Sequence, residues 1–209
     1  MKVIYEDENV KVLDKPAGVN SDDFERRAHR LDKDTSGVLL IAKNDEALEF
    51  LQKQFKERKV KKQYLALATG NLKNNKGVIE TLLGRSPKDR RKQAVYLPGD
   101  PKAENKREAS TVYKVLRKFE NYDLIEVEPQ TGRKHQIRAH LAYLGHPIAG
   151  DKLYGFKNEK CPEGLERQFL HSSYLKIKLL DNQIKEFKSS LPKDLELCLQ
   201  KLKPLLKHN

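Results

Sequence analysis

A run of nine residues near the N-terminus places a carboxylate among basic side chains. It reads His29-Arg30-Leu31-Asp32-Lys33-Asp34-Thr35-Ser36-Gly37 and leads into the apolar segment 38–42. Because nearby positive charge favours the ionised form of a carboxyl group, Asp32 is expected to stay charged at neutral pH. Such a carboxylate can act as a nucleophile, a general base, a metal ligand or an ion-pair partner.

The same run also resembles the first half of a calcium-binding loop. Asp32, Asp34 and Ser36 would supply oxygen ligands at alternate positions, with Gly37 following them. A loop of this kind closes with a bidentate glutamate at its twelfth position, and that position is Lys43 here. A cation in place of the closing ligand repels calcium, so the sequence predicts no metal site.

A second stretch combines a turn with the start of a basic helix, and it reads Thr131-Gly132-Arg133-Lys134-His135-Gln136-Ile137-Arg138-Ala139-His140. The spacing predicts a helix from near Lys134 to Leu144, with Thr131 as a candidate cap. A helix N-terminus with cations in its first turns binds anions, which makes Arg133, His135 and Gln136 candidates for substrate binding. The alternative interpretation is a surface helix whose charges are only solvated.

Tyr64 is the third candidate for chemistry, within the expected strand Lys62–Thr69. A tyrosine in a strand is most often a half-buried packing residue. Its other use is to stack on a nucleic-acid base. The sequence around Tyr64 leaves both interpretations open.

Composition favours a polyanionic partner. The 209 residues include 42 Lys and Arg against 30 Asp and Glu, a net charge of +12 that would attract nucleic acid or merely keep the protein soluble. No apolar run approaches the roughly 20 residues that span a bilayer, and the N-terminus lacks a signal-peptide stretch. Cys161 and Cys198 lie far apart and are expected to be reduced, as in a cytoplasmic protein.

The pattern of elements predicts an α+β fold. Helices are expected at 45–58, 134–144 and 195–202, and residues 84–108 are expected to form an exposed loop or ribbon. Short alternating segments predict strands at 3–5, 10–13, 38–43, 62–69, 78–83, 111–117, 124–128, 175–180 and 184–187.

Taken together, these motifs resemble those of the RluA-type RNA pseudouridine synthases. The quoted runs are HRLDKDTSG, KKQYLAL and TGRKHQIRAHLAYLGHPIAGD, and the resemblance extends from the turn at residues 15–18 to the segment 169–171. It implies a pseudouridine synthase fold, with a mixed, mostly antiparallel sheet, flanking helices and a central active-site cleft. It also implies that residues 1–209 form one catalytic domain of two lobes sharing a sheet, without an N-terminal S4 RNA-binding module.

The resemblance implies an isomerase that flips specific uridines out of structured RNA and converts them to pseudouridine. Carried over by position, Asp32 matches the catalytic aspartate, and Tyr64 matches the tyrosine that packs on the target base. Arg138 matches the arginine paired with that aspartate. Arg30 matches the residue that assists base flipping, and Leu170 matches an apolar residue lining the pocket.

The expected partner is RNA, with ribosomal RNA favoured over transfer RNA, and the protein is expected to be a cytoplasmic monomer. The isomerisation involves no redox step or hydrolysis, so neither a metal nor an organic cofactor is expected. One alternative is a non-catalytic RNA-binding or ribosome-assembly protein, which would be expected to lose Asp32, Tyr64 or Arg138. Another is a metal-dependent nuclease using Asp32 and Asp34, which would need further carboxylates where the second motif is cationic.

Overall fold

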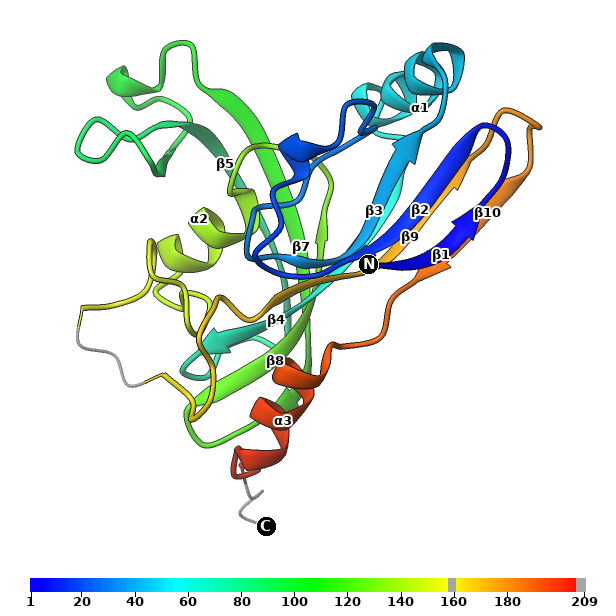
Figure 1. Cartoon of the computed structure of the whole chain (residues 1–209). Helices are drawn as coiled ribbons and strands as arrows, with labels where there is room; N and C mark the ends of the chain where they lie inside the picture. The colour runs from blue at the N-terminus through cyan, green and yellow to red at the C-terminus, as the bar shows by residue number, and fades with distance from the viewer. Residues whose placement is uncertain (158–160, 206–209) are drawn as a thin grey trace. The chain divides into compact units, whose positions relative to one another are not determined.

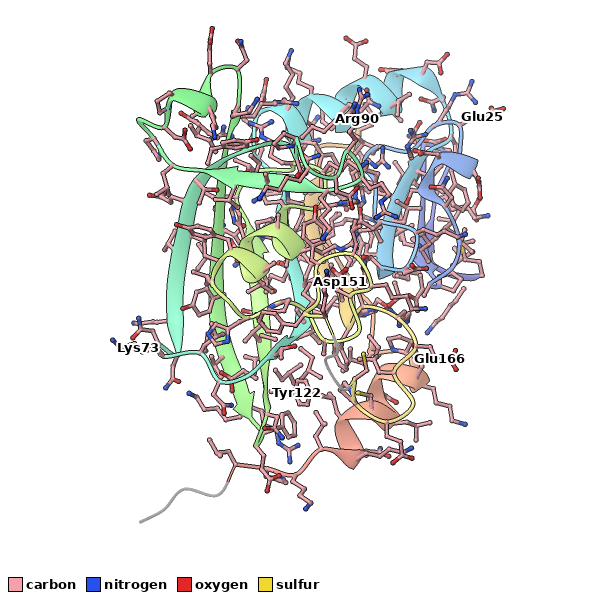
Figure 2. All side chains as sticks on the ribbon, turned by 90° about the vertical axis from the view of Figure 1, so that its left-hand side faces the viewer. Glu25, Lys73, Arg90, Tyr122, Asp151 and Glu166 are labelled. Atoms are coloured by element: carbon pink, nitrogen blue, oxygen red, sulfur yellow. The ribbon has the colours of Figure 1, made fainter. Side chains whose placement is uncertain are left out.

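The computed structural model describes residues 1–157 and 161–205, which form two compact units (Figure 1; side chains in Figure 2). The first unit contains residues 1–64 and 170–193, and the second contains residues 65–169 and the described residues from 194 onward. Strands and three helices build them, and all but one of the described strand pairings are antiparallel. The α+β fold with a mixed, mostly antiparallel sheet is therefore confirmed.

The first unit is built from strands in the order β1-β2-β3-β9, with β10 paired to β9. Its strands are β1 (Lys2–Glu6), β2 (Val10–Lys15), β3 (Ser36–Ala42), β9 (Leu170–Lys178) and β10 (Ile184–Lys188). Among the described pairings with a stated direction, β3 with β9 is the parallel one, and it sets Ser36 beside His171 and Gly37 beside Ser172. This pairing brings the end of the first motif next to a segment that is distant in the sequence.

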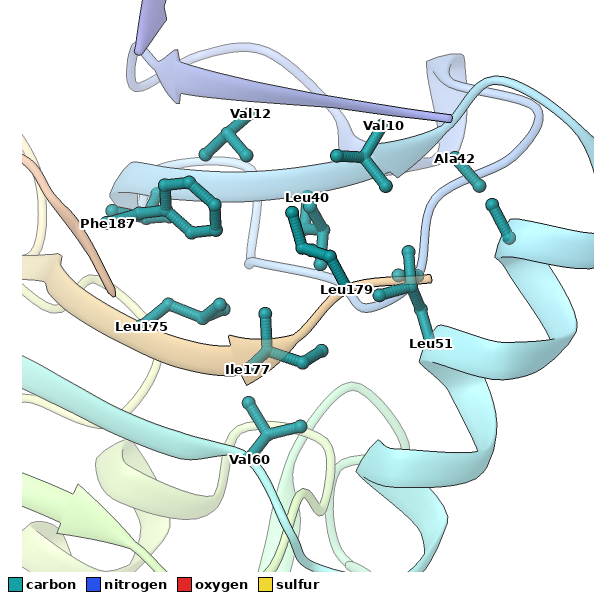
Figure 3. Close-up of a cluster of buried hydrophobic side chains, with 13 residues drawn as sticks. Val10, Val12, Leu40, Ala42, Leu51, Val60, Leu175, Ile177, Leu179 and Phe187 are labelled. Atoms are coloured by element: carbon teal, nitrogen blue, oxygen red, sulfur yellow. The ribbon is translucent and has the colours of Figure 1, made fainter. Parts of the chain in front are cut away.

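An apolar core holds helix α1 (Asp45–Lys56) against this sheet. The Asn44 side chain caps the helix by accepting a hydrogen bond from the Ala47 amide at 2.8 Å. Leu51 of α1 lies among Val10, Leu40 and other apolar side chains of the sheet (Figure 3). Burial of these side chains fixes β3, which begins only four residues after Asp32.

The second unit has strands in the order β4-β8-β7-β5-β6. They are β4 (Lys61–Thr69, which enters this unit at Leu65), β5 (Lys76–Arg85), β6 (Gln93–Tyr96), β7 (Arg107–Lys118) and β8 (Tyr122–Pro129). Helix α2 (Gln136–Tyr143) contacts β6, β7 and β8, and α3 (Lys193–Lys201) is the last helix. Leu83, Ala109 and Ala139 form the apolar contact between strands and α2.

Each helix and strand expected from the sequence has a counterpart, with some ends shifted. The segment 84–108 is more ordered than a loop, because β6 pairs with β5 and a short 3-10 helix spans Pro101–Ala103. Within the described ranges, no helix combines the length and the apolar character needed to cross a membrane.

Candidate active site

Asp32 lies in a tight turn before β3, in the first unit. Its carbonyl oxygen accepts a hydrogen bond from the Thr35 amide at 3.0 Å, which closes the turn. The buried Ser21 hydroxyl donates to the Leu31 carbonyl oxygen at 2.8 Å and accepts from the Leu31 amide at 3.1 Å. Both polar backbone groups of the preceding residue are therefore tied to one side chain, which holds the chain where it enters Asp32.

Lys15, the last residue of β2, holds the chain on the other side of Asp32. Its ammonium donates to the carbonyl oxygens of Pro16 (2.9 Å), Val19 (2.8 Å) and Lys33 (3.0 Å). A lysine is almost never fully buried unless it is paired, and Lys15 is 0% exposed. Sequence reasoning treated residues 15–18 only as a turn and missed this role, because the lysine's partners are set by the fold.

Tyr64 and Asp32 come together within the first unit. Tyr64 is buried, and burial raises the pKa of its phenol to about 12. A hydrogen bond with the Ser172 side chain lowers this pKa in part, and the negative charge of Asp32 is a smaller cause that raises it. The phenol is therefore protonated at neutral pH, and it can serve as an apolar wall and a hydrogen-bonding group.

Ser172 reaches this position because Gly37 lets two strands approach closely. Gly37 has φ of +112°, in the region that favours glycine, and a Cβ there would overlap the backbone of Ser172. Ser172 is buried at 1% exposure. The sequence offered no signal for Ser172, whereas Gly37 stood in the first motif.

Leu170 and Arg30 also belong to the first unit. Leu170 begins β9, is buried, and points to the same side of the strand as Ser172, because side chains alternate along a strand. Arg30 is exposed, and its guanidinium lies 3.7 Å from the carboxylate of Asp22. The burial of Leu170 fits a pocket wall, and the flipping role of Arg30 stays a prediction.

Arg138 lies in the second unit, where it forms a bidentate ion pair with Asp151. Nε donates to Asp151 Oδ2 at 2.7 Å and Nη2 donates to Oδ1 at 2.8 Å. The two side chains are only 9% and 0% exposed. Burial alone would raise the pKa of Asp151, but the Arg138 guanidinium and two backbone amides outweigh it and hold the pKa below its usual value.

The helix that carries Arg138 begins later than the sequence predicted. It starts at Gln136, and His135 before it adopts a left-handed conformation with φ of +54° and gives no side-chain cap. Thr131, the expected cap, instead accepts from the Ser110 amide and donates to Gln136 Oε1 at 2.7 Å. The expected cap of Thr131 and the start near Lys134 are therefore wrong.

The three predicted anion-binding residues differ in their surroundings. Gln136 is buried, and its amide group bonds to Ser110, Thr111, Thr131 and Arg133, so its contact with substrate stays a prediction. Arg133 Nε donates to the Glu108 carbonyl oxygen at 2.9 Å, and His135 Nδ1 lies 3.2 Å from the Tyr154 hydroxyl. Substrate binding by these two residues stays a prediction.

The predicted pairing of Arg138 with Asp32 joins residues of different units. It stays a prediction, as do the central cleft and the single domain with a shared sheet.

Two positions of the calcium-like run, Ser36 and Lys43, bond to other side chains. The Ser36 hydroxyl bonds to His171 Nδ1 at 3.0 Å, while Lys43 bonds to Glu6 at 3.1 Å. Elsewhere in residues 1–157 and 161–205, no group of three or more His, Cys, Asp or Glu side chains could hold a metal ion. Ser36 and His171 also look like a nucleophile and its base, but both are buried, so no substrate reaches them.

Comparison with known proteins identifies the family of this chain. Residues 9–143 match the family model described as RNA pseudouridylate synthase. An uncharacterised RNA pseudouridine synthase of Chloroflexus aurantiacus is 42% identical, over 83% of this chain and 52% of that protein. The ribosomal large subunit pseudouridine synthase D of Borreliella burgdorferi is 37% identical, over 91% of this chain and 65% of that protein. The chain thus spans between half and two thirds of these relatives' lengths.

Among solved structures, human RNA pseudouridylate synthase domain containing 1 superposes with a TM-score of 0.83 and 29% identity. The match covers 97% of this chain and 88% of that one. The chain belongs to the RNA pseudouridylate synthase family, in its RluA-type branch.

Proposed function

We propose that this chain isomerises uridine to pseudouridine in RNA. The observation that carries the proposal is the Asp32 turn, which Ser21 and Lys15 hold from both sides beside the buried ring of Tyr64. A carboxylate on a fixed backbone next to an aromatic wall is suited to reacting with a planar base. Family membership supports the same reaction.

The reaction breaks the bond between C1′ and N1 of the uridine and forms a bond between C1′ and C5. The hydrogen of C5 is lost to solvent and N1 gains a proton, so no oxidant or co-reactant is needed. Three roles are open to the Asp32 carboxylate: attack on C1′, addition to the ring, or removal of a sugar proton to start an elimination.

A uridine must leave its stack before an enzyme can reach its glycosidic bond, at a cost of a few kcal/mol. We propose that Tyr64 and Leu170 contact the flipped base while Arg30 occupies the vacated space. The position of Arg138 in its motif gives it a role in the same reaction. Phosphate contacts with the basic surface would supply binding energy for the extrusion.

We further propose a structured ribosomal RNA as the substrate. The support comes from relatives named as synthases of the large ribosomal subunit. Comparing pseudouridine maps of all cellular RNA with and without the gene tests this proposal. A site lost from transfer RNA alone would contradict it.

Tritium release from an unmodified large-subunit ribosomal RNA transcript labelled with [5-³H]uridine tests the activity. Asp32→Asn keeps the shape of the side chain without its charge, so it should release no tritium while RNA binding persists. Asp34→Asn is the matched control, because Asp34 is an exposed carboxylate in the same turn. Near-normal turnover by Asp32→Asn would contradict the assignment, and rescue of a deletion strain by that variant would favour the non-catalytic RNA-binding role.

A further inference from the structure

Asp151 is a buried carboxylate that the proposed reaction does not use directly. It follows α2 and is the last residue of the run TGRKHQIRAHLAYLGHPIAGD (labelled in Figure 2). Its two oxygens accept Nε and Nη2 of Arg138, an arrangement that uses two of the five guanidinium donors. The pair therefore fixes one edge of the guanidinium and leaves three donors outside the pair.

The backbone around Asp151 is itself fixed. Oδ1 also accepts the amides of Leu153 (2.9 Å) and Tyr154 (3.0 Å), which sets the orientation of the carboxylate. The Asp151 amide donates to the Ile148 carbonyl oxygen at 3.1 Å. Gly150 has φ of +74°, and a Cβ there would overlap the backbone of Arg167. The carboxylate is thus oriented before it meets Arg138.

Tyr154 restricts Arg138 from a second direction. The guanidinium carbon of Arg138 lies over the Tyr154 ring, 5.1 Å from its centroid. The hydroxyl of that ring accepts the Gln93 amide at 2.6 Å, which ties the ring to β6. Arg138 is held along one edge by Asp151 and over one face by Tyr154.

A buried ion pair of this kind is weak evidence of a contribution to stability, because the cost of removing two charges from water offsets their attraction. Arg138 occupies a motif position that the family resemblance matches to the active site. Fixing the position of its guanidinium is therefore a better explanation of the buried pair than stability. We propose that Asp151 is a positioning residue that sets the orientation of the Arg138 guanidinium for catalysis. This inference rests on the proposed function.

Asp151→Asn is the variant that separates positioning from folding. If Oδ1 keeps its two backbone amides, the new NH₂ group faces Arg138 Nε–H, so two donors meet and the bidentate pair is lost. We expect the single-turnover rate of tritium release at saturating transcript to fall about 10–100-fold, by analogy with the range seen when partners that orient metal ligands are removed. The dissociation constant for the same transcript should change less than about 2-fold.

Asp123→Asn is the matched control. Asp123 is a fully buried carboxylate of the same unit that accepts the Leu72 amide at 2.7 Å and the Asn71 side chain at 2.9 Å, without an arginine in these hydrogen bonds. This variant should lower the melting temperature yet leave the rate of the folded enzyme near normal. An equal loss of rate in Asp123→Asn and Asp151→Asn would overturn the proposal, because general destabilisation would then explain both.

A double-mutant cycle tests whether Asp151 acts through Arg138. Arg138→Lys keeps the cation but cannot form the planar bidentate pair, so it should slow the reaction with little change in affinity. In that background Asp151→Asn should add no further loss of rate. If the losses of rate from the two substitutions multiply in the double variant, the proposal is overturned. A normal rate in Arg138→Lys would also overturn it. Arg138→Lys is the deciding variant if Asp151→Asn does not fold.

One measurement needs no RNA. In ¹⁵N spectra of arginine side chains, the Arg138 Nε–H signal, assigned by its absence from Arg138→Lys, should exchange slowly with water. It should broaden or disappear in Asp151→Asn but persist in Asp123→Asn. An unchanged signal in Asp151→Asn would overturn the positioning role. A wild-type protein that releases no tritium would count against the proposed function instead, so the two failures are distinguishable.

Discussion

Lys15 and Ser21 show how single buried polar side chains build the reactive turn. Both side chains act on the backbone next to Asp32. Ser21 bonds to the backbone of Leu31, and Lys15 bonds to the carbonyl oxygen of Lys33. Preorganisation of this kind means that the reacting group need not be ordered anew when substrate binds.

Lys15→Met should destabilise the protein and slow the reaction. The methionine fills a similar volume but leaves the carbonyl oxygens of Pro16 and Val19 without the ammonium that bonds them. The two hydrogen bonds are only partly buried, so water can replace part of what is lost, and the free energy of unfolding should fall by about 1–3 kcal/mol. Urea unfolding measures the loss, with Lys11→Met on the same strand as control.

Lys11 is partly exposed and pairs with Glu6 at 3.1 Å, so its replacement should change stability by about 0.5 kcal/mol or less. If Lys15→Met and Lys11→Met lowered the free energy of unfolding equally, the hydrogen bonds of the Lys15 ammonium would add no more stability than a surface ion pair.

The sequence indicated the candidate reactive residues of the first unit but not the residues that support them. Asp32 and Tyr64 stand in recognisable motifs, and the structure places them close enough for one charge to act on the other's pKa. Lys15, Ser172 and Asp151 gain their roles from contacts that only the folded chain creates. The Lys33 carbonyl, for example, lies 18 positions from its lysine partner.

At the scale of elements, the parallel pairing of β3 with β9 places Ser172 beside the first motif. The pairing is short, with Ser36 and Gly37 opposite His171 and Ser172. His171 Nε2 lies 3.0 Å from the Ser189 carbonyl oxygen, so it donates there and Nδ1 accepts the Ser36 hydroxyl. These buried bonds fix the register of the two strands.

Gly37→Ala should disrupt this pairing. The added Cβ would overlap the backbone of Ser172, and the φ of +112° is strained for alanine. We expect a loss of several kcal/mol in the free energy of unfolding, since the backbone cannot move aside as a flexible side chain could.

Gly99→Ala is the matched control for Gly37→Ala, measured by the same urea unfolding. Gly99 also has a positive φ, of +88°, but a Cβ there meets nothing within 4 Å. That variant should lose only about 1 kcal/mol from backbone strain. If both variants lost the same amount, close strand approach would not be the reason for glycine at position 37.

Local signals predicted some element boundaries well and others poorly. Helix α1 begins where Asn44 indicates, because its cap is formed by adjacent residues. The start of α2 was misplaced because Thr131 and Gln136 bond to Ser110 and Thr111 of a distant strand rather than to the helix end. Strand β6 was not predicted as such, since its pairing with β5, rather than its own pattern, defines it.

At the scale of the whole molecule, His29 in the first unit and His140 in the second make stability depend on pH, because each has a lowered pKa. Burial lowers the pKa of His140 to about 4, and its ring bonds to Thr81 and Thr111 at 2.9 Å each. Burial, followed by the charge of Lys62, lowers the pKa of His29 to about 3. The ring of His29 stacks on Phe55 and accepts the Leu40 amide, so it is neutral when folded.

Stability should therefore fall as the pH drops below about 6.5. The unfolded histidines take up protons there while the folded ones do not, so protonation stabilises the unfolded state relative to the folded state until the pH reaches the folded pKa of about 4 or 3. At pH 5.0 each histidine should cost about 2 kcal/mol relative to pH 7.5, as measured by urea unfolding. His140→Gln should remove the part that belongs to the second unit, and an unchanged pH dependence in that variant would show that other groups dominate.

The excess of basic residues concerns the whole molecule as well, because it predicts RNA binding that weakens steeply with salt. Each phosphate contact adds about 0.7–0.9 to the slope of log affinity against log salt concentration. The loop between β5 and β6 carries exposed Arg90, whereas Arg91 already pairs with Asp89 through Nε at 3.0 Å and Nη2 at 2.8 Å. Lys92 lies near the Tyr154 ring rather than fully in solvent.

Neutralising Arg90, Arg91 and Lys92 together should therefore flatten the salt slope by about 2 rather than 3, because Arg91 is already compensated. The single-turnover rate at saturating RNA should stay near normal, since these charges act in binding. Lys73 and Lys76 supply the control, because Lys73 and Arg90 lie at opposite ends of the second unit in Figure 2. A double neutralisation of these lysines with an equal effect would mean that the net charge, and not the loop, binds RNA.

Arg30→Ala should behave in the opposite way, because Arg30 is proposed to act on the flipped base. The single-turnover rate should fall, while the salt slope of RNA binding stays nearly unchanged. A loss of affinity alone would mean that Arg30 is an ordinary phosphate contact.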